Sequence, residues 1–174
     1  PKIDLLYDKF KNLNYDFFID LGTNYGEFSI PLSKIVKKVI SIEPNPEIYR
    51  TFLETKKNYE NIDSFQNAFF NEITKIDLFK NSSQSGGCFI EGSRSDIDGK
   101  RKTNFKKFFD GLIKDPNHKN YDVIEVSTIN FEYLNNYYNF SNKKIIVKID
   151  VEGMDLQFMK NFTQKFLKLD VVPS

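Results

Sequence analysis

One stretch decides the fold, and it reads Phe17-Phe18-Ile19-Asp20-Leu21-Gly22-Thr23-Asn24-Tyr25-Gly26. It is an apolar run that contains an acid near its end and leads into a turn with two glycines. A helix-like segment follows, and then a second apolar run, 39–42, which leads into Glu43, 21 residues after Gly22. Strand, turn, helix and strand in this order predict one βαβ unit.

The acids and glycines of this unit predict a nucleoside-type cofactor site. Glycine lets the backbone turn sharply and approach a ligand closely. An acid at the end of the second strand, here Glu43, is placed to accept hydrogen bonds from both hydroxyls of a ribose.

The spacing of the turn favours S-adenosylmethionine (SAM) over NAD. A dinucleotide site usually has G-x-G-x-x-G at a helix N-terminus, whereas here the spacing is G-x-x-x-G and Asp20 precedes the first glycine. A carboxylate beside the turn would repel a pyrophosphate but suits the ammonium and sulfonium charges of SAM. The alternative is an ordinary βα turn with an incidental acid.

Beyond this unit, strands alternate with helices, which predicts an α/β fold with a doubly wound, mostly parallel sheet of the Rossmann-like class. Strands are expected at 17–21, 38–42, 63–69, 122–128, 144–150 and 169–172, helices at 2–15, 25–36, 46–58, 130–138 and 153–167, and a β-hairpin at 75–79 and 87–90. The helix residues expected to be buried are Leu5, Leu6, Phe10, Phe28, Leu32, Ile35, Val36, Ile48, Phe52 and Leu53. Because the chain stops as the last strand forms, we expect a fold truncated after its fifth core strand.

We expect residues 1–174 to form a single domain, because this length suffices for one core and no repeat or linker divides it. A polar and basic segment at about 92–120 is interpreted as a solvated insertion. The alternative is a lid or a binding surface for an anionic substrate. His118, the only histidine, lies in this insertion and receives no role.

Composition excludes several classes of protein. The net charge is +1, so no overall field favours nucleic acid or a membrane. The single cysteine, Cys88, cannot form an internal disulfide. No apolar run approaches the roughly 20 residues that cross a bilayer. We therefore expect a cytoplasmic protein with no membrane partner, and the sequence does not predict an oligomeric state.

A second group of polar residues, Lys148-Ile149-Asp150-Val151-Glu152-Gly153, closes the buried strand 144–150. In open α/β sheets, ligands bind beyond the carboxyl ends of the strands near the topological switch point. If the three strands are neighbours, Asp20, Glu43 and Asp150 line one edge of the sheet. Such a cluster suits a cationic cofactor and can raise one pKa for base chemistry.

The candidate catalytic residues are therefore Asp150, Lys148 and Glu152. In the structural alternative, Lys148 pairs with one of the acids and Glu152 caps the next helix. Asp150 and Glu152 could also bind a divalent cation, but no further ligands at suitable spacing are evident, so no metal site is predicted.

Taken together, these motifs resemble the FkbM-type class I SAM-dependent methyltransferases. The matching segments are 18–26, 39–47, 66–68, 82–87, 126–130 and 147–153, and they span about 17–162. The resemblance implies O-methylation of a hydroxyl, often on a sugar, a glycan or a natural product. The insertion is longer than is usual in the family, which leaves the acceptor open.

The resemblance also implies roles for individual residues. The residues of the turn after the first strand would hold the methionine end of SAM. Glu43 would bind the ribose, and Asp150 would lie near the transferred methyl group. Asn67 and Ala68, in the second half of the expected third strand, would flank the adenine. The complete predicted cofactor set is Asp20, Gly22, Asn24, Tyr25, Gly26, Glu43, Pro44, Asn67 and Ala68.

The leading hypothesis is thus a SAM-dependent O-methyltransferase acting on a carbohydrate, a glycan or a related small molecule. One alternative is an RNA methyltransferase that uses the basic insertion, although nucleic acid is disfavoured because the basic residues lie in one segment. Another alternative is a nucleotide-binding module of the NAD type without catalysis.

Overall fold

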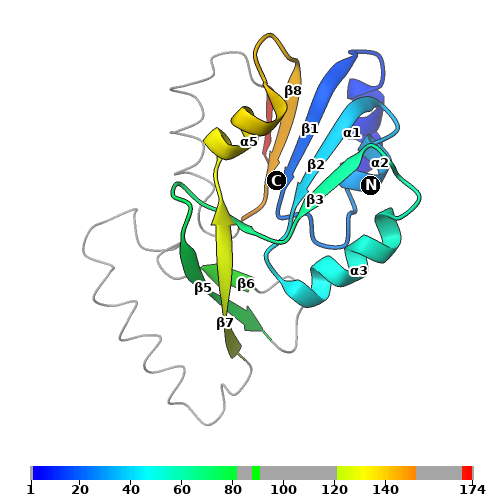
Figure 1. The fold of residues 1–174 in the computed structure, drawn as a ribbon. Coiled ribbons are helices and arrows are strands. Elements are labelled where there is room, and N and C mark those ends of the chain that lie inside the picture. Colours follow the sequence, from blue (N-terminus) through cyan, green and yellow to red (C-terminus); the bar gives the residue numbers. More distant parts are fainter. Residues whose placement is uncertain (1, 82–87, 91–120, 152–169, 174) are drawn as a thin grey trace.

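The computed structural model describes residues 2–81, 88–90, 121–151 and 170–173 (Figure 1). Several predictions fall on other residues: the segment 82–87, the insertion at 92–120 with His118, the helix at 153–167 and the role of Glu152. In the described part, no helix is long and apolar enough to cross a membrane.

The main sheet has five strands, and every neighbouring pair is parallel. In spatial order the strands are β3 (Ile62–Phe65), β2 (Val36–Ile42), β1 (Tyr15–Leu21), β8 (Ile145–Ile149) and β9 (Asp170–Pro173). After β1, the chain adds β2 and β3 on one side of β1, and later adds β8 on its other side. The topological switch point therefore lies between β1 and β8, and the predicted parallel α/β sheet is confirmed.

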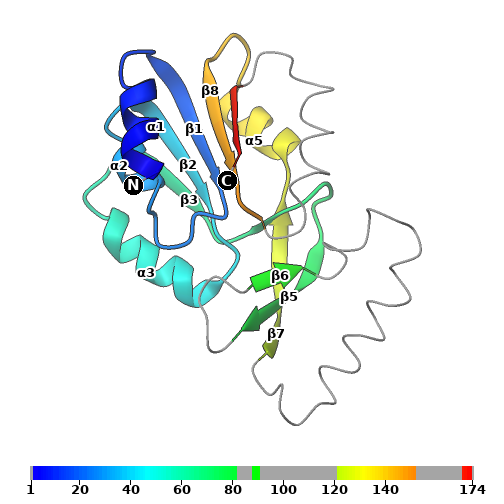
Figure 2. The ribbon, with the colours of Figure 1, turned by 180° about the vertical axis from the view of Figure 1, so that it is seen from behind.

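Both faces of this sheet are covered, which explains why its central strands are continuous apolar runs. One face packs on α1 (Lys2–Phe10), α2 (Ser29–Leu32) and α3 (Pro46–Lys56), the other on α5 (Phe131–Tyr138). Successive strand residues alternate between the faces: Phe18 belongs to the cluster with α1–α3, and Ile19 to the cluster with α5. Figure 1 shows α5 in front of the sheet, and Figure 2 shows α1 in front of the opposite face.

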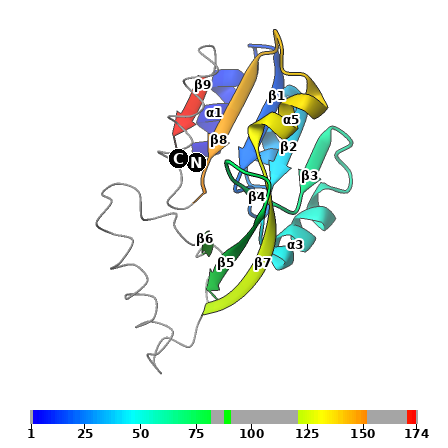
Figure 3. The same ribbon diagram turned by 60° about the vertical axis from the view of Figure 1, so that its left-hand side comes forward.

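A second, four-stranded sheet lies beyond the carboxyl ends of the main sheet (Figure 3). Its strands, in spatial order, are β4 (Ala68–Phe69), β7 (Tyr121–Ile129), β5 (Lys75–Asn81) and β6 (Cys88–Ile90). The pair β4–β7 is parallel, and β7–β5 and β5–β6 are antiparallel. The β5–β6 pair is the predicted hairpin.

The strand expected at 63–69 is divided between the two sheets, and the prediction of one strand is wrong. Residues 62–65 pair with β2, whereas residues 68–69 pair with β7. The division follows from Ala68, which is fully buried in a small core with Leu78 and Val126. Asn67 reinforces it, because its side-chain amide donates to the backbone oxygen of Ser127 at 3.2 Å.

The helix expected at 25–36 is also much shorter, because α-helix covers only Ser29–Leu32. Gly26 has a φ of +89°, which a right-handed helix cannot contain, so residues 24–28 form turns instead. After Leu32 the chain tightens into i→i+3 hydrogen bonds, in which Lys34 N donates to the oxygen of Pro31 at 3.3 Å. Strand β2 then begins at Val36.

Two expected core residues are on the surface. Leu5 of α1 is 75 % exposed and Leu53 of α3 is 38 % exposed. Each is the sequence neighbour of a helix residue that does face the sheet, respectively Leu6 and Phe52, and neighbours in a helix point about 100° apart. Helix α1 also ends at Phe10 rather than 15, and the chain enters β1 at Tyr15.

Candidate functional site

Three acids predicted for the site lie at the carboxyl ends of neighbouring strands. Asp20 is near the end of β1, Glu43 follows β2, and Asp150 follows β8. The order β2-β1-β8 places them side by side at the switch point, where α/β sheets bind ligands.

The turn after β1 is held against both neighbouring strands. Gly22 N and Thr23 N both donate to the oxygen of Ile42 at 3.0 Å, and Asp150 N donates to the oxygen of Leu21 at 3.0 Å. Gly22 has a φ of +77°, and a Cβ there would lie 2.0 Å from the backbone oxygen of Asp150. The close approach that this glycine permits is therefore to the chain itself.

Gly26 makes a similar approach within the protein. A Cβ there would lie 2.6 Å from the ring of Phe52 on α3. Both glycines thus let the turn pack tightly under its neighbours, in addition to any contact with a ligand. Between them, Asn24 has a left-handed φ of +53°, and Tyr25 is 40 % exposed.

Glu43 is buried, and its carboxylate holds two loops together. Its Oε2 accepts from Asn24 N and its Oε1 from Asn45 N, both at 2.9 Å. Burial raises the pKa of Glu43, and the two backbone hydrogen bonds oppose that rise. Asn45 in turn caps α3, because its Oδ1 accepts from Glu47 N at 3.0 Å, and Pro46 opens the helix as predicted. Pro44 is half-buried between these residues.

Asp20 is completely buried beneath the turn, in a polar cluster that spans three strands. The register aligns it with Ser41 on β2 and with Lys148 on β8. Its Oδ1 accepts from Lys148 Nζ at 3.1 Å and its Oδ2 from Ser29 Oγ at 2.7 Å. Ser29 Oγ is also 2.7 Å from Ser41 Oγ, so the Ser41 hydroxyl is the donor in that pair. Burial raises the pKa of Asp20, and the Lys148 ammonium opposes that rise.

The Lys148 ammonium has further partners above Asp20. It donates to the oxygen of Gly22 at 2.9 Å, lies 3.5 Å from Asp150 Oδ2, and sits 5.2 Å from the ring centroid of Phe28. The pairing with an acid that was the structural alternative for Lys148 is therefore present. The Asp150 side chain, in contrast, is 52 % exposed.

Sequence reasoning missed Ser29 and Ser41. Ser41 had a usable signal, since it interrupts the apolar run of β2 at a position whose side chain faces α1–α3. Ser29 had none, because its place depends on where the short helix α2 begins.

The remaining predicted residues lie apart from this cluster or outside the described chain. Ala68 is in the core of the second sheet, and Asn67 is tied to β7. Glu152 lies outside the described residues. Within the described ranges, no three His, Cys, Asp or Glu side chains are arranged to hold a metal ion.

One buried atom in the turn has no partner. Among the side chains that the structure describes, Asn24 Oδ1 is the only buried nitrogen or oxygen without a hydrogen bond. Buried polar atoms are nearly always hydrogen-bonded, so an isolated acceptor at a switch point suits the donor of a ligand.

Comparison with known proteins gives a family. The domain model described as "Methyltransferase FkbM domain" matches residues 20–171. Comparison with functionally curated proteins gave no match.

Solved structures with a similar fold include three bacterial proteins. Methyltransferase FkbM from Methylobacillus flagellatus KT is 12% identical with a TM-score of 0.49, over 91% of this chain and 32% of that one. YcgJ from Bacillus subtilis is 18% identical with a TM-score of 0.35, over 38% and 29%. SMU.1697c, a putative methyltransferase from Streptococcus mutans in complex with SAH, is 19% identical with a TM-score of 0.34, over 39% and 42%.

The chain thus spans less than half the length of each of these proteins. The domain model, however, matches well over half of the chain, from the acid near the end of β1 to the last strand of the main sheet. On that match, the chain belongs to the FkbM methyltransferase family.

Proposed function

We propose that this chain binds SAM and acts as a SAM-dependent methyltransferase, whose acceptor is a hydroxyl of a carbohydrate, a glycan or a related small molecule. The observation that carries the proposal is the arrangement of Glu43. Its carboxylate is fixed at the switch point by backbone amides on both oxygens, with acceptor capacity left over.

The remaining capacity of Glu43 matches a ribose. A carboxylate has about four acceptor positions, and Asn24 N and Asn45 N use two of them. Two positions are left for two adjacent hydroxyls. Because both oxygens are already oriented, the carboxylate pays little ordering entropy when a ligand binds.

The unpartnered oxygen of Asn24 supports a ligand at the same place. It lies in the residue whose backbone amide bonds to Glu43, so the two acceptors belong to one turn. The neighbouring Tyr25 offers an exposed aromatic surface beside them. The proposed set for the methionine end and the ribose is therefore Asn24, Tyr25 and Glu43, with Asp20 acting from below the turn.

Charge favours SAM over NAD in this proposal. The switch point carries three carboxylates, of Asp20, Glu43 and Asp150, and one ammonium, of Lys148. When all are ionised the excess is negative, which attracts a cation and repels a pyrophosphate. A bound cation would also favour the ionised forms of Asp20 and Glu43, which burial disfavours.

When bound, SAM supplies an already activated methyl group, so positioning provides much of the acceleration. The chain's part is then to hold the cofactor and to accept the proton of a hydroxyl. Asp150 is the proposed proton acceptor, because it directly follows β8 at the switch point and half of its side chain is exposed. Lys148, 3.5 Å away, holds that carboxylate in place.

Titration calorimetry with SAM, S-adenosylhomocysteine (SAH) and NAD tests the cofactor. We expect SAM and SAH to bind more tightly than NAD, and tighter binding of NAD would overturn the proposal. The acceptor is tested in the longest available form of the protein, by SAH release on a panel of sugar nucleotides, glycans and RNA. Methylation of RNA alone would replace the proposed acceptor class. Asp150→Asn should lower turnover more than SAM affinity.

A further inference from the structure

Lys148 reaches from one strand into the turn of another. Its side chain is only 8 % exposed, and its Nζ donates to the backbone oxygen of Gly22 at 2.9 Å. Lysine side chains are usually flexible and solvated. A lysine ammonium buried against a glycine carbonyl in the candidate cofactor turn therefore requires an explanation.

The turn is held from β2 by its N–H groups. Gly22 N and Thr23 N donate to the oxygen of Ile42, and Asn24 N donates to Glu43 Oε2. Lys148, in contrast, lies on β8 and donates to a carbonyl oxygen of the turn, that of Gly22. The peptide plane between Gly22 and Thr23 is thus fixed from both sides, by its carbonyl and by its amide.

The ammonium that holds this carbonyl is itself immobilised. It is bonded to Asp20 Oδ1 at 3.1 Å, and Asp20 is fixed in turn by Ser29. The ring of Phe28 covers it at 5.2 Å, and Asp150 Oδ2 lies 3.5 Å away. An ammonium has three N–H donors, and two of them are used by Asp20 Oδ1 and the Gly22 oxygen, while the Asp150 carboxylate adds an ionic contact.

We infer that Lys148 is a positioning residue, which fixes the Gly22 carbonyl and so preorganises residues 22–24 to bind the cofactor. The inference rests on the proposed function, since it concerns the same site. It differs from a direct role in catalysis, because Lys148 acts through the backbone of the turn. Preorganisation raises affinity by lowering the ordering cost of binding.

A simpler role is that Lys148 only neutralises the buried Asp20. Removing one partner of a buried ion pair is strongly destabilising, whereas removing both charges is often nearly neutral. The two roles can be separated, because the contact with Gly22 is to a backbone oxygen. That contact does not depend on the charge of Asp20.

The test compares three variants: Lys148→Met, Asp20→Asn and the double variant. Urea unfolding gives stability, and calorimetry with SAH gives affinity. We expect Lys148→Met to be strongly destabilised and the double variant to recover most of that stability. Its Kd for SAH should nevertheless stay at least about tenfold above that of Asp20→Asn, the loss expected for one hydrogen bond from a charged donor.

Lys38→Met is the matched control. Lys38 is also a strand lysine in an ion pair, 2.8 Å from Asp63, but it lies near the start of β2, away from the turn. Its SAH affinity should equal that of the wild type, and a tenfold loss there would overturn the inference. If the double variant does not fold, Lys148→Gln in the Asp20→Asn background replaces it. The neutral glutamine side chain is shorter than that of lysine but can still form a hydrogen bond with the asparagine at position 20.

The outcomes distinguish the inference from the proposed function. If the wild type binds SAH and the double variant binds it as tightly as Asp20→Asn, Lys148 only balances charge and the inference is wrong. If the wild type binds neither SAM nor SAH, the proposed function fails and the inference fails with it. If the double variant regains stability but not affinity for SAH, the result supports both the inference and the proposed function.

Discussion

Replacing Glu43 with alanine tests the proposed site most directly. Glu43 is 6 % exposed, and each oxygen of its carboxylate already accepts one backbone N–H. A ribose hydroxyl would add a hydrogen bond to a charged acceptor, which contributes about 1.5–3 kcal/mol. We count one such bond in full, because the second hydroxyl can regain water in the variant. The Kd for SAM or SAH should therefore rise roughly ten- to 150-fold.

Stability has to be measured beside affinity, because Glu43→Ala also leaves Asn24 N and Asn45 N without their acceptor. Two effects oppose each other. The lost hydrogen bonds destabilise the fold, whereas removal of a buried carboxylate, whose pKa burial raises, relieves a cost. Circular dichroism and urea unfolding establish that the variant is folded before calorimetry is interpreted.

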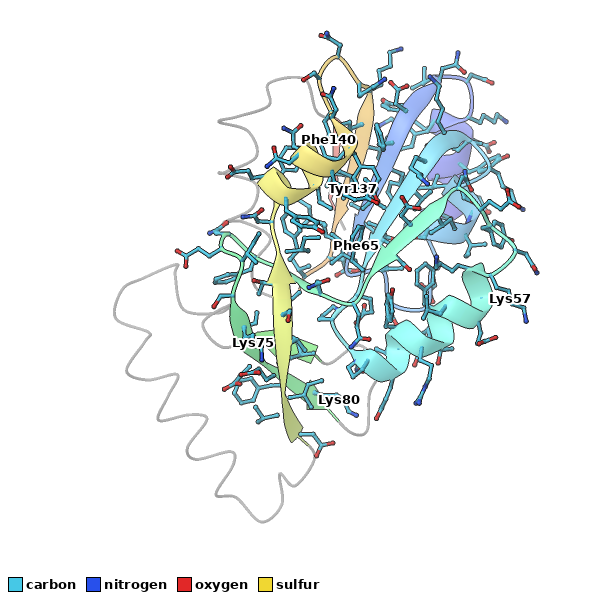
Figure 4. The ribbon with its side chains drawn as sticks, viewed as in Figure 1. Lys57, Phe65, Lys75, Lys80, Tyr137 and Phe140 are labelled. Carbon is cyan, nitrogen blue, oxygen red and sulfur yellow. The ribbon has the colours of Figure 1, made fainter. Side chains whose placement is uncertain are left out.

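Glu47→Ala is the matched control for charge. Glu47 lies in the first turn of α3, is 63 % exposed and accepts from Lys80 Nζ at 2.7 Å. Lys80 belongs to β5 of the second sheet, where Figure 4 labels it. Surface ion pairs contribute little, so its Kd should stay within about twofold of the wild type. An unchanged Kd in a folded Glu43→Ala variant would refute the assignment of Glu43 to the ribose.

Three further predictions concern stability. A lysine side chain and a backbone amide bond to Asp16 and lower its pKa below 3.8. The ionised Asp16 carboxylate therefore stabilises the folded protein above pH 3.8, and this contribution is lost as the pH falls through the lower pKa of the folded state. Asp16→Asn should lower the free energy of unfolding in urea by about 1 kcal/mol at pH 7 and should have no effect well below pH 3.8. Gly22→Ala should destabilise more than Gly26→Ala, since its Cβ meets backbone rather than a ring, and equal midpoints in urea would contradict this. Phe52→Ala should cost about 3–5 kcal/mol and Leu53→Ala under about 1, and calorimetric melting that ranks them oppositely would reverse the assigned orientation of α3.

The strands at the switch point could be predicted from the sequence because their burial on both faces leaves a strong pattern. The apolar runs of β1, β2 and β8 were located to within two residues, and their terminal acids followed. That Asp20, Glu43 and Asp150 share one edge was predicted only on the condition that their strands are neighbours, which the strand order β2-β1-β8 meets. Parallel strands linked by helices leave few possible orders.

The remaining features depend on contacts that a local pattern does not contain. Strand 63–69 divides because Ala68 is buried against strands that lie far along the chain. The helix after β1 is short because Gly26 adopts a positive φ, and that φ is set by packing on Phe52. Asp20 looked like a ligand-binding acid, but whether it faces a ligand or a lysine depends on the register of β8, which only the fold establishes.

The aligned polar residues Ser41, Asp20 and Lys148 have a consequence for how the sheet assembles. Isoleucine- and valine-rich strands can pair in several alignments of similar energy, because one apolar neighbour replaces another. A slip of one residue moves every side chain to the opposite face. For β8 such a slip would carry Lys148 into the apolar layer around Leu134 and leave Asp20 without its counter-ion. Breaking a buried pair costs about 3–5 kcal/mol, so these three residues discriminate against misaligned sheets that the apolar residues alone would tolerate.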